Sequence, residues 1–140
     1  MKKKINESES NLIKAVVLSI FDDNGPTPKV FWPDDLDEKA GLLIAMKTIS
    51  LLMGDTVYQD GEESDAVNYF GILPFPDIKL NGLTYFFLIH DENARGNALA
   101  ATITILIDEN DKVFFYQNMK YLRIIMDNAA TNIQNVKGYT

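Results

Sequence analysis

The chain has 140 residues, of which 46% are hydrophobic and 24% charged, and its formal net charge is −7. This length and apolar content suit one globular domain with an ordinary core. Nucleic acids and anionic membranes are bound mainly through clustered lysine and arginine, so an acidic chain disfavours both and favours a basic partner surface. Because there is no cysteine, a disulfide framework and a thiolate zinc site are excluded, which is compatible with a cytoplasmic location.

The N-terminal segment 1–11 differs in composition from the rest. Its lysines, Lys2 to Lys4, are followed by polar and acidic residues and not by an apolar run, so we expect a disordered tail and no secretory signal. No run of about 18 apolar residues occurs anywhere, and no membrane insertion is expected. The domain itself is predicted to span residues 12–136.

Two strands are predicted first. Residues 13–21 are apolar on both faces of a strand, and the turn-forming stretch 22–26 ends it. A short return strand follows at 29–32, closed by Pro33.

A helix is then expected over residues 36–53. Asp35 would cap its N-terminus, with Glu38 as the reciprocal partner at the spacing of a capping box. Gly54 is the expected C-terminal stop. Residues 56–66 are acidic and lack any periodic pattern, which indicates a mobile loop.

Three more strands are predicted as a meander. The first covers 67–73 and is closed by the proline-rich stretch 74–77, and Asn81-Gly82 indicates a tight turn before the next. That strand is centred on 85–89, and the last runs over 98–107 with Ala101, Ile103, Ile105 and Ile107 on one face and Thr102 and Thr104 on the other.

From Asp111 onward, apolar residues recur at helical spacing. The recurring positions are Phe114, Tyr121, Leu122, Ile125, Ala129 and Ile133. An alternative is that residues 113–116 extend the sheet before this helix begins.

The predicted element order is ββαβββα. Because the first, fourth and fifth strands are apolar on both faces, each face of the sheet needs a covering layer. We therefore predict an α+β fold, a three-layer α/β/α sandwich around a five-stranded, mostly antiparallel sheet.

The segment 85–108 carries a family resemblance. An aromatic strand, an acidic turn, Ala94-Arg95-Gly96 and a Thr/Ile strand resemble the longin domain of folliculin and, more loosely, that of the nitrogen-permease-regulator-like subunit of the GATOR complex. The apolar stretch 15–18 and the Asn-Gly-Pro turn at 24–26 are similar to the opening of those domains. The resemblance spans roughly 12–134 and implies a longin-like (profilin-like) sandwich of the longin/roadblock superfamily.

In that family, the arginine matching Arg95 acts as an arginine finger on Rag-type small GTPases. The resemblance therefore implies a catalytic role in trans for Arg95, supported by Asp91, Glu92 and Gly96. An arginine suits this chemistry because charge developing on the phosphoryl oxygens needs a planar donor that stays charged. The alternative is an exposed arginine paired loosely with Asp91 or Glu92.

Other chemistry finds little support. The sequence has no phosphate-binding glycine loop, so it predicts no nucleotide hydrolysis of its own and no cofactor. His90 is the only histidine, which excludes a multi-histidine metal site. Acidic clusters at 34–38 and 108–111 fall where helices begin, so capping explains them without a metal.

A partner-binding surface is predicted on the first helix and the third strand. The helix is apolar around much of its circumference, and its alternative explanation is deep burial. The predicted partner-binding residues are Leu42, Met46, Ile49, Met53, Tyr69, Phe70, Gly71 and Ile72. An unpaired edge strand is a template for another chain, and the resemblance implies dimerisation through this edge and helix.

We therefore expect a cytoplasmic regulator of a GTP-bound small Ras- or Rag-like GTPase, in the form of a GTPase-activating protein that uses Arg95. The alternative is a non-catalytic longin scaffold or adaptor that forms a homodimer or a heterodimer with another longin or roadblock subunit. A small-molecule sensor is a third reading, for which the sequence offers no polar pocket constellation.

Overall fold

The computed structural model describes residues 12–57, 69–94 and 97–136, with the side chains of 51–57 left aside. The strands are β1 (Ile13–Asp22), β2 (Gly25–Trp32), β3 (Tyr69–Phe75), β4 (Leu80–His90) and β5 (Ala98–Asp108). The helices are α2 (Glu38–Val57) and α4 (Val113–Gln134), with short 3-10 helices η1 (Pro76–Ile78) and η3 (Glu109–Asp111). The 3-10 helices, which the sequence did not predict, precede β4 and α4.

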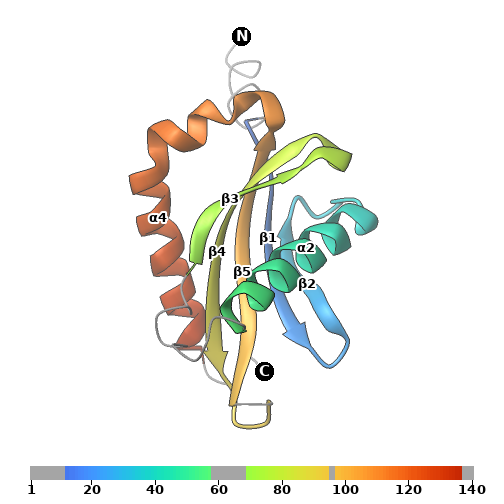
Figure 1. Ribbon diagram of the computed structural model, residues 1–140, viewed down its shortest axis with the longest axis vertical. Coiled ribbons are helices and arrows are strands. Elements are labelled where there is room, and N and C mark those ends of the chain that lie inside the picture. The colour runs from blue at the N-terminus through green and yellow to red at the C-terminus, as the bar shows by residue number, and fades with distance from the viewer. Residues whose placement is uncertain (1–11, 58–68, 95–96, 137–140) are drawn as a thin grey trace.

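The strands form one antiparallel sheet in the order β2-β1-β5-β4-β3, so β2 and β3 are its edges (Figure 1). The longest ladder joins β4 to β5, from the pair Leu80 and Asp108 to the pair His90 and Ala98. An α+β fold with a five-stranded antiparallel sheet and two long helices is therefore confirmed for the described residues.

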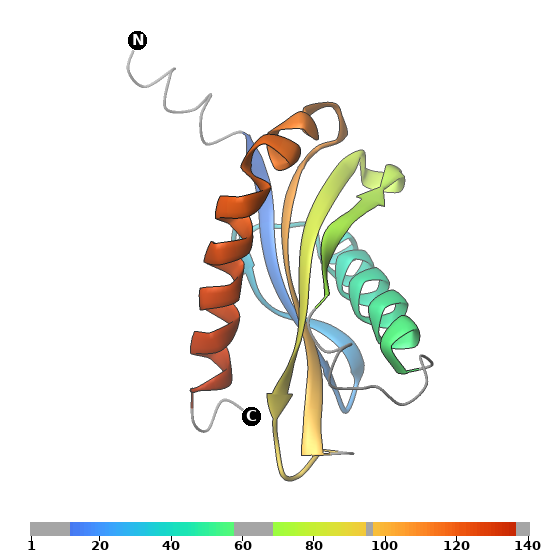
Figure 2. The same cartoon turned by 60° about the vertical axis from the view of Figure 1, so that its left-hand side comes forward.

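The two long helices cover opposite faces of the sheet (Figure 2). Ala101, Ile103, Ile105 and Ile107 of β5 pack in the cluster that includes α4, as their alternation predicts. The other face of the sheet packs against α2, where Ile44 meets Val17 and Leu106. Along β1 and β5, neighbouring residues thus pack alternately towards α4 and towards α2.

The α2 face buries hydroxyl groups as well as apolar side chains. Thr48 of α2 and Thr102 of β5 are 2.8 Å apart between their Oγ1 atoms, and Thr84 and Thr104 are 3.1 Å apart. All four side chains are buried. Their hydrogen bonds satisfy one another, which is what allows polar residues in this layer.

The start and end of α2 differ from the prediction. The carboxylate of Asp37, not Asp35, caps the helix, because its Oδ2 accepts the Ala40 N–H at 3.1 Å. Gly54 does not stop the helix, which continues to Val57. The predicted loop at 56–66 therefore overlaps α2, and its remainder lies outside the described residues.

The predicted Asn81-Gly82 turn is wrong. Both residues are paired within β4, opposite Pro74 and Leu73 of β3. The chain reverses earlier, through η1 and Lys79, which has a left-handed φ of 57°. Glycine also occurs inside strands where neighbouring side chains leave no space for a Cβ, and Gly82 is such a case.

The alternative in which 113–116 extends the sheet is also wrong, since α4 begins at Val113. Its buried positions are Phe115, Leu122, Met126 and Ala130. Tyr121 and Ile125, two of the apolar positions that recur at helical spacing, are 70% and 58% exposed. Apolar residues surround most of this helix, so spacing alone could not identify which stripe faces the sheet.

Polar contacts attach α4 to the β3–β4 side of the sheet. The Tyr85 hydroxyl donates a hydrogen bond to Oδ1 of Asp127 at 2.5 Å. Near the end of the helix, Gln134 Nε2 donates to the Leu88 carbonyl at 2.8 Å. These bonds hold the helix over β4.

Tyr85→Phe is expected to lower the free energy of unfolding by about 1–2 kcal/mol, because it removes a hydrogen bond to a carboxylate that water can reach. Burial, followed by the bond to Asp127, raises the pKa of Tyr85 to about 12. A raised tyrosine pKa stabilises the fold below about pH 10, and this contribution is lost as pH rises towards 12.

Urea unfolding of both proteins across the alkaline range checks this prediction. The difference between them should be constant up to about pH 10 and should shrink above it. A constant difference up to pH 12 would contradict the assignment.

Candidate functional site

The β4–β5 hairpin is closed by backbone hydrogen bonds. The Asp91 N–H donates to the Asn97 carbonyl at 3.0 Å, and the Asn97 N–H donates to the Ala94 carbonyl at 2.9 Å. The Ala94 N–H donates to the Asp91 carbonyl at 3.0 Å. Asn97 has a left-handed φ of 62°, a conformation that asparagine tolerates better than most residues. The described part of this loop is therefore a compact turn.

Side chains reinforce the turn. Oδ1 of Asp91 accepts the Asn93 N–H at 2.9 Å, so this carboxylate helps to shape the loop. Glu92 is exposed. Arg95 and Gly96 lie outside the described residues, and the catalytic role of Arg95 and its support by Asp91 and Glu92 stay predictions.

The predicted face of α2 is only partly at the surface. Leu42 and Met46 are 42% and 55% exposed. Ile49 is fully buried against Phe86 and Ala100, so its assignment to a partner-binding face is wrong. The sheet extends beneath this turn of the helix. Met53 belongs to α2, but its side chain lies outside the described residues.

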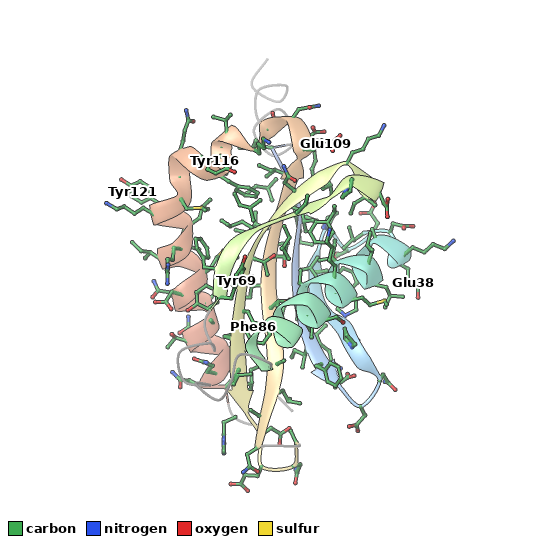
Figure 3. All side chains as sticks on the ribbon, viewed as in Figure 1. Glu38, Tyr69, Phe86, Glu109, Tyr116 and Tyr121 are labelled. Carbon is green, nitrogen blue, oxygen red and sulfur yellow. The ribbon has the colours of Figure 1, made fainter. Side chains whose placement is uncertain are left out.

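β3 lies at the sheet edge, where partner binding was predicted. Tyr69 is partly exposed and lies across Gly71, where an added Cβ would be 2.6 Å from its hydroxyl (Figure 3). Phe70 and Ile72 are half-buried and pack on the α4 side. The Phe70 ring contacts Tyr85 edge-on, with the ring centroids 6.2 Å apart. These side chains contribute to the fold as well as to the edge.

Pro74 and Lys47 shorten the usable edge of β3. Pro74 has no N–H, and its carbonyl accepts a hydrogen bond from Lys47 Nζ of α2. The Lys47 Nζ also lies 4.9 Å from the centroid of the Phe75 ring. Because outward backbone groups alternate along an antiparallel strand, those of Phe70 and Ile72 remain for another chain. This is a short pairing site.

Two exposed apolar regions were not predicted as surfaces. One is on α4, where Tyr121, Ile124 and Ile125 are each more than half exposed. The other is on β2, where Val30 and Trp32 are 58% and 49% exposed. Tyr121 and Ile125 belong to the apolar positions that recur at helical spacing in α4, and spacing alone does not separate them from the buried ones.

No group of three metal-ligating side chains comes together in the described part of the chain. No helix in that part is long and apolar enough to cross a membrane. No family model, curated protein or solved structure matches this chain.

Proposed function

We propose that this chain is a longin-like, cytoplasmic regulator of a small Ras- or Rag-like GTPase and that it binds the GTP-bound form. The observation that carries the proposal is the β4–β5 hairpin, whose described loop residues are held by three backbone hydrogen bonds at the end of the longest ladder. The resemblance of residues 85–108 to the folliculin-type longin domain supports the same segment. A loop that is ordered before binding loses little conformational entropy when a partner closes on it.

In this proposal Arg95 enters the nucleotide site of the GTPase and donates to the phosphoryl oxygens as negative charge develops there. The chemistry belongs to the partner, which holds GTP and positions water. The regulator contributes a positive, planar donor. Asp91 supports this role by holding the loop through its bond to the Asn93 N–H.

The second candidate function is that of a scaffold. It would bind the GTPase, or a second longin or roadblock subunit, without contacting the nucleotide. Leu42 and Met46 favour it, because they are exposed apolar side chains on α2. Lys47 joins that helix to the β3 edge, so helix and edge form one continuous surface. We call Leu42, Met46 and the outward groups of Phe70 and Ile72 the α2–β3 face.

Met46→Lys is expected to weaken binding of the partner to the α2–β3 face by about tenfold or more, since it places a charge in an apolar contact. The measurement is titration calorimetry with Ras- and Rag-like GTPases loaded with GDP and aluminium fluoride, or with GDP alone. Tighter binding of the transition-state mimic is expected. Ile124→Lys, an equally exposed change on α4, is the matched control and should bind like wild type.

Binding by none of these GTPases would overturn the proposed function. Equal binding by wild type and Met46→Lys would remove the α2–β3 face from it. Equal affinity for the two nucleotide states would count against a role in hydrolysis and in favour of the scaffold.

A further inference from the structure

The two edges of the sheet differ in the backbone groups that they offer to another chain. On β2, Pro26 and Pro28 carry no N–H, and a register shift interrupts the ladder that this strand forms with β1. Prolines and bulges are the usual protection of an edge strand. β3 has one proline, Pro74, and its ladder with β4 is regular throughout. β3 is therefore the edge that is open to a further strand.

Phe70 and Ile72 supply the outward backbone groups of β3. The Pro74 carbonyl faces outward, since Lys47 of α2 donates a hydrogen bond to it. Outward groups alternate along an antiparallel strand, so the N–H and C=O groups of Phe70 and Ile72 also point away from β4. Each of these residues offers one donor and one acceptor. Only an extended segment can satisfy them together, because its own groups alternate with the same period.

Two cations lie beside this edge, one on each face of the sheet. The Arg123 guanidinium of α4 lies 5.3 Å from the centroid of the Phe70 ring, on the α4 face. The Lys47 Nζ of α2 lies 4.9 Å from the centroid of the Phe75 ring, on the other face. Among the described residues, neither cation forms an ion pair with a carboxylate. Both charges can therefore attract an anionic partner.

Among the described residues, the charges around β3 leave this edge positive. Asp127 lies one turn after Arg123, but its carboxylate accepts a hydrogen bond from β4. Lys120, three residues before Arg123, adds a positive charge to the same stretch of helix. In the turn after β3, Asp77 and Lys79 cancel. The net charge of −7 acts from farther away, and physiological salt screens charges beyond about 8 Å.

The positions of the two cations determine where a partner strand needs acidic side chains. Phe70 and Phe75 are separated by an odd number of positions, so they lie on opposite faces, about 16 Å apart along the strand. A partner strand with two carboxylates at the same separation presents one to each face. Between them, Ile72 packs on the α4 face and favours an apolar neighbour. Charge and spacing together specify an acidic, extended segment.

We propose that the β3 edge binds an acidic, extended segment of a partner protein as an added strand antiparallel to β3. The backbone of the segment pairs with Phe70 and Ile72, and two of its carboxylates reach Arg123 and Lys47. Arg123 holds one carboxylate with its planar fork, and Lys47 attracts the other as a point charge. The inference names the segment that pairs with the β3 part of the α2–β3 face, and to that extent it rests on the scaffold candidate. It does not require the partner to be a GTPase.

Fluorescence anisotropy of a labelled peptide, Glu-Val-Thr-Val-Thr-Glu, with the full chain tests the proposal. In the antiparallel register, the two glutamates lie opposite Phe70 and Phe75, and the two valines lie opposite Ile72 and Pro74. Replacing both glutamates by glutamine is expected to weaken binding about tenfold. During a titration, the amide NMR signals of Phe70 and Ile72 should shift.

Arg123→Gln and Lys47→Gln are each expected to weaken binding of the glutamate peptide by about threefold to tenfold and to leave binding of the glutamine peptide unchanged. Lys39→Gln is the matched control and should bind like wild type. It makes the same charge change on α2, but near Gly41, which lies against Pro28 of β2. N-methylation of both valines removes N–H groups that face β3 and should abolish binding. N-methylation of both threonines, whose N–H groups face away, should not.

Equal binding of the glutamate and glutamine peptides would overturn the acidic partner, and equal binding of the two N-methylated peptides would overturn strand pairing. A peptide that binds in no form would overturn both. Binding only after deletion of residues 60–66 would show that the chain's own acidic segment covers the edge. A dimer that pairs two copies through β3 and excludes the peptide would equally contradict the proposal. GTPase binding without peptide binding would overturn this inference alone and leave the proposed function standing.

Discussion

GTP hydrolysis by the partner GTPase is expected to return to its intrinsic rate when Arg95→Ala replaces the wild-type chain. The stimulation supplied by an arginine finger is about 10³- to 10⁵-fold, so the loss should be of that size. Arg95→Lys should recover little, because an ammonium lacks the planar fork that contacts two phosphoryl oxygens at once. Single-turnover release of phosphate at saturating regulator measures the effect.

Arg123 is a matched control, since it is the other arginine of the chain and its guanidinium lies over the Phe70 ring of the edge strand β3. Arg123→Lys should keep full stimulation. Calorimetry should show that both Arg95 variants still bind the GTPase, which separates catalysis from binding. Equal stimulation by wild type and both Arg95 variants would eliminate the catalytic role and leave the scaffold.

The hairpin that carries Arg95 shows how far sequence reasoning reaches. Alternation over 98–107 predicted which β5 residues share a face, because a strand side chain has only two directions, and the apolar set packs against α4. Turn-forming residues predicted the loop at 91–97, whose described residues form a compact turn. The chemical role of Arg95 was not predictable from the pattern of residues. An arginine in a turn can equally well serve solubility, ion pairing or catalysis.

The helices were harder to interpret. Residues spaced three and four apart predict a helix, but a helix that is apolar all round has no single stripe to choose. Ile49 and Tyr121 show opposite consequences. Ile49 was assigned to a partner-binding face and is buried, whereas Tyr121, one of the apolar positions that define the spacing of α4, is 70% exposed. Only the crossing of each helix over the sheet decides these positions, and that is a tertiary property.

The two long helices cross opposite faces of the sheet. α2 crosses one face from β1 and β2 towards β3, where Lys47 donates to the Pro74 carbonyl, whereas α4 is bonded to β4 and contacts β3 on the other face (Figures 1 and 2). The α2–β3 face and the exposed β2 side chains Val30 and Trp32 therefore lie on opposite faces of the sheet.

Gly82→Ala is expected to lower the free energy of unfolding by about 1–3 kcal/mol, the usual cost of overpacking a core. An added Cβ would lie 2.7 Å from Thr104 Cγ2 and 2.8 Å from Phe75 Cε1. The Phe75 ring is 1% exposed, and a buried ring can shift only by displacing the side chains packed around it. Removing a glycine also stabilises by about 0.4–1 kcal/mol through the unfolded chain, and the clash outweighs that gain. Urea unfolding at neutral pH measures the difference.

Gly41→Ala separates these two effects and should have the opposite sign. Gly41 lies within α2, and its added Cβ would meet Pro28 Cγ at 3.6 Å and Leu36 Cδ2 at 3.7 Å, which are ordinary contacts. Stability should rise by about 0.5–1 kcal/mol, the helix preference for alanine over glycine. At Gly82, replacing the Phe75 ring with the smaller leucine side chain should relieve part of the clash. The double variant Gly82→Ala, Phe75→Leu should therefore lose less free energy of unfolding than the sum of the two single losses. If Gly82→Ala were as stable as wild type, a clash with the Phe75 ring would not be the reason that glycine occupies this strand position.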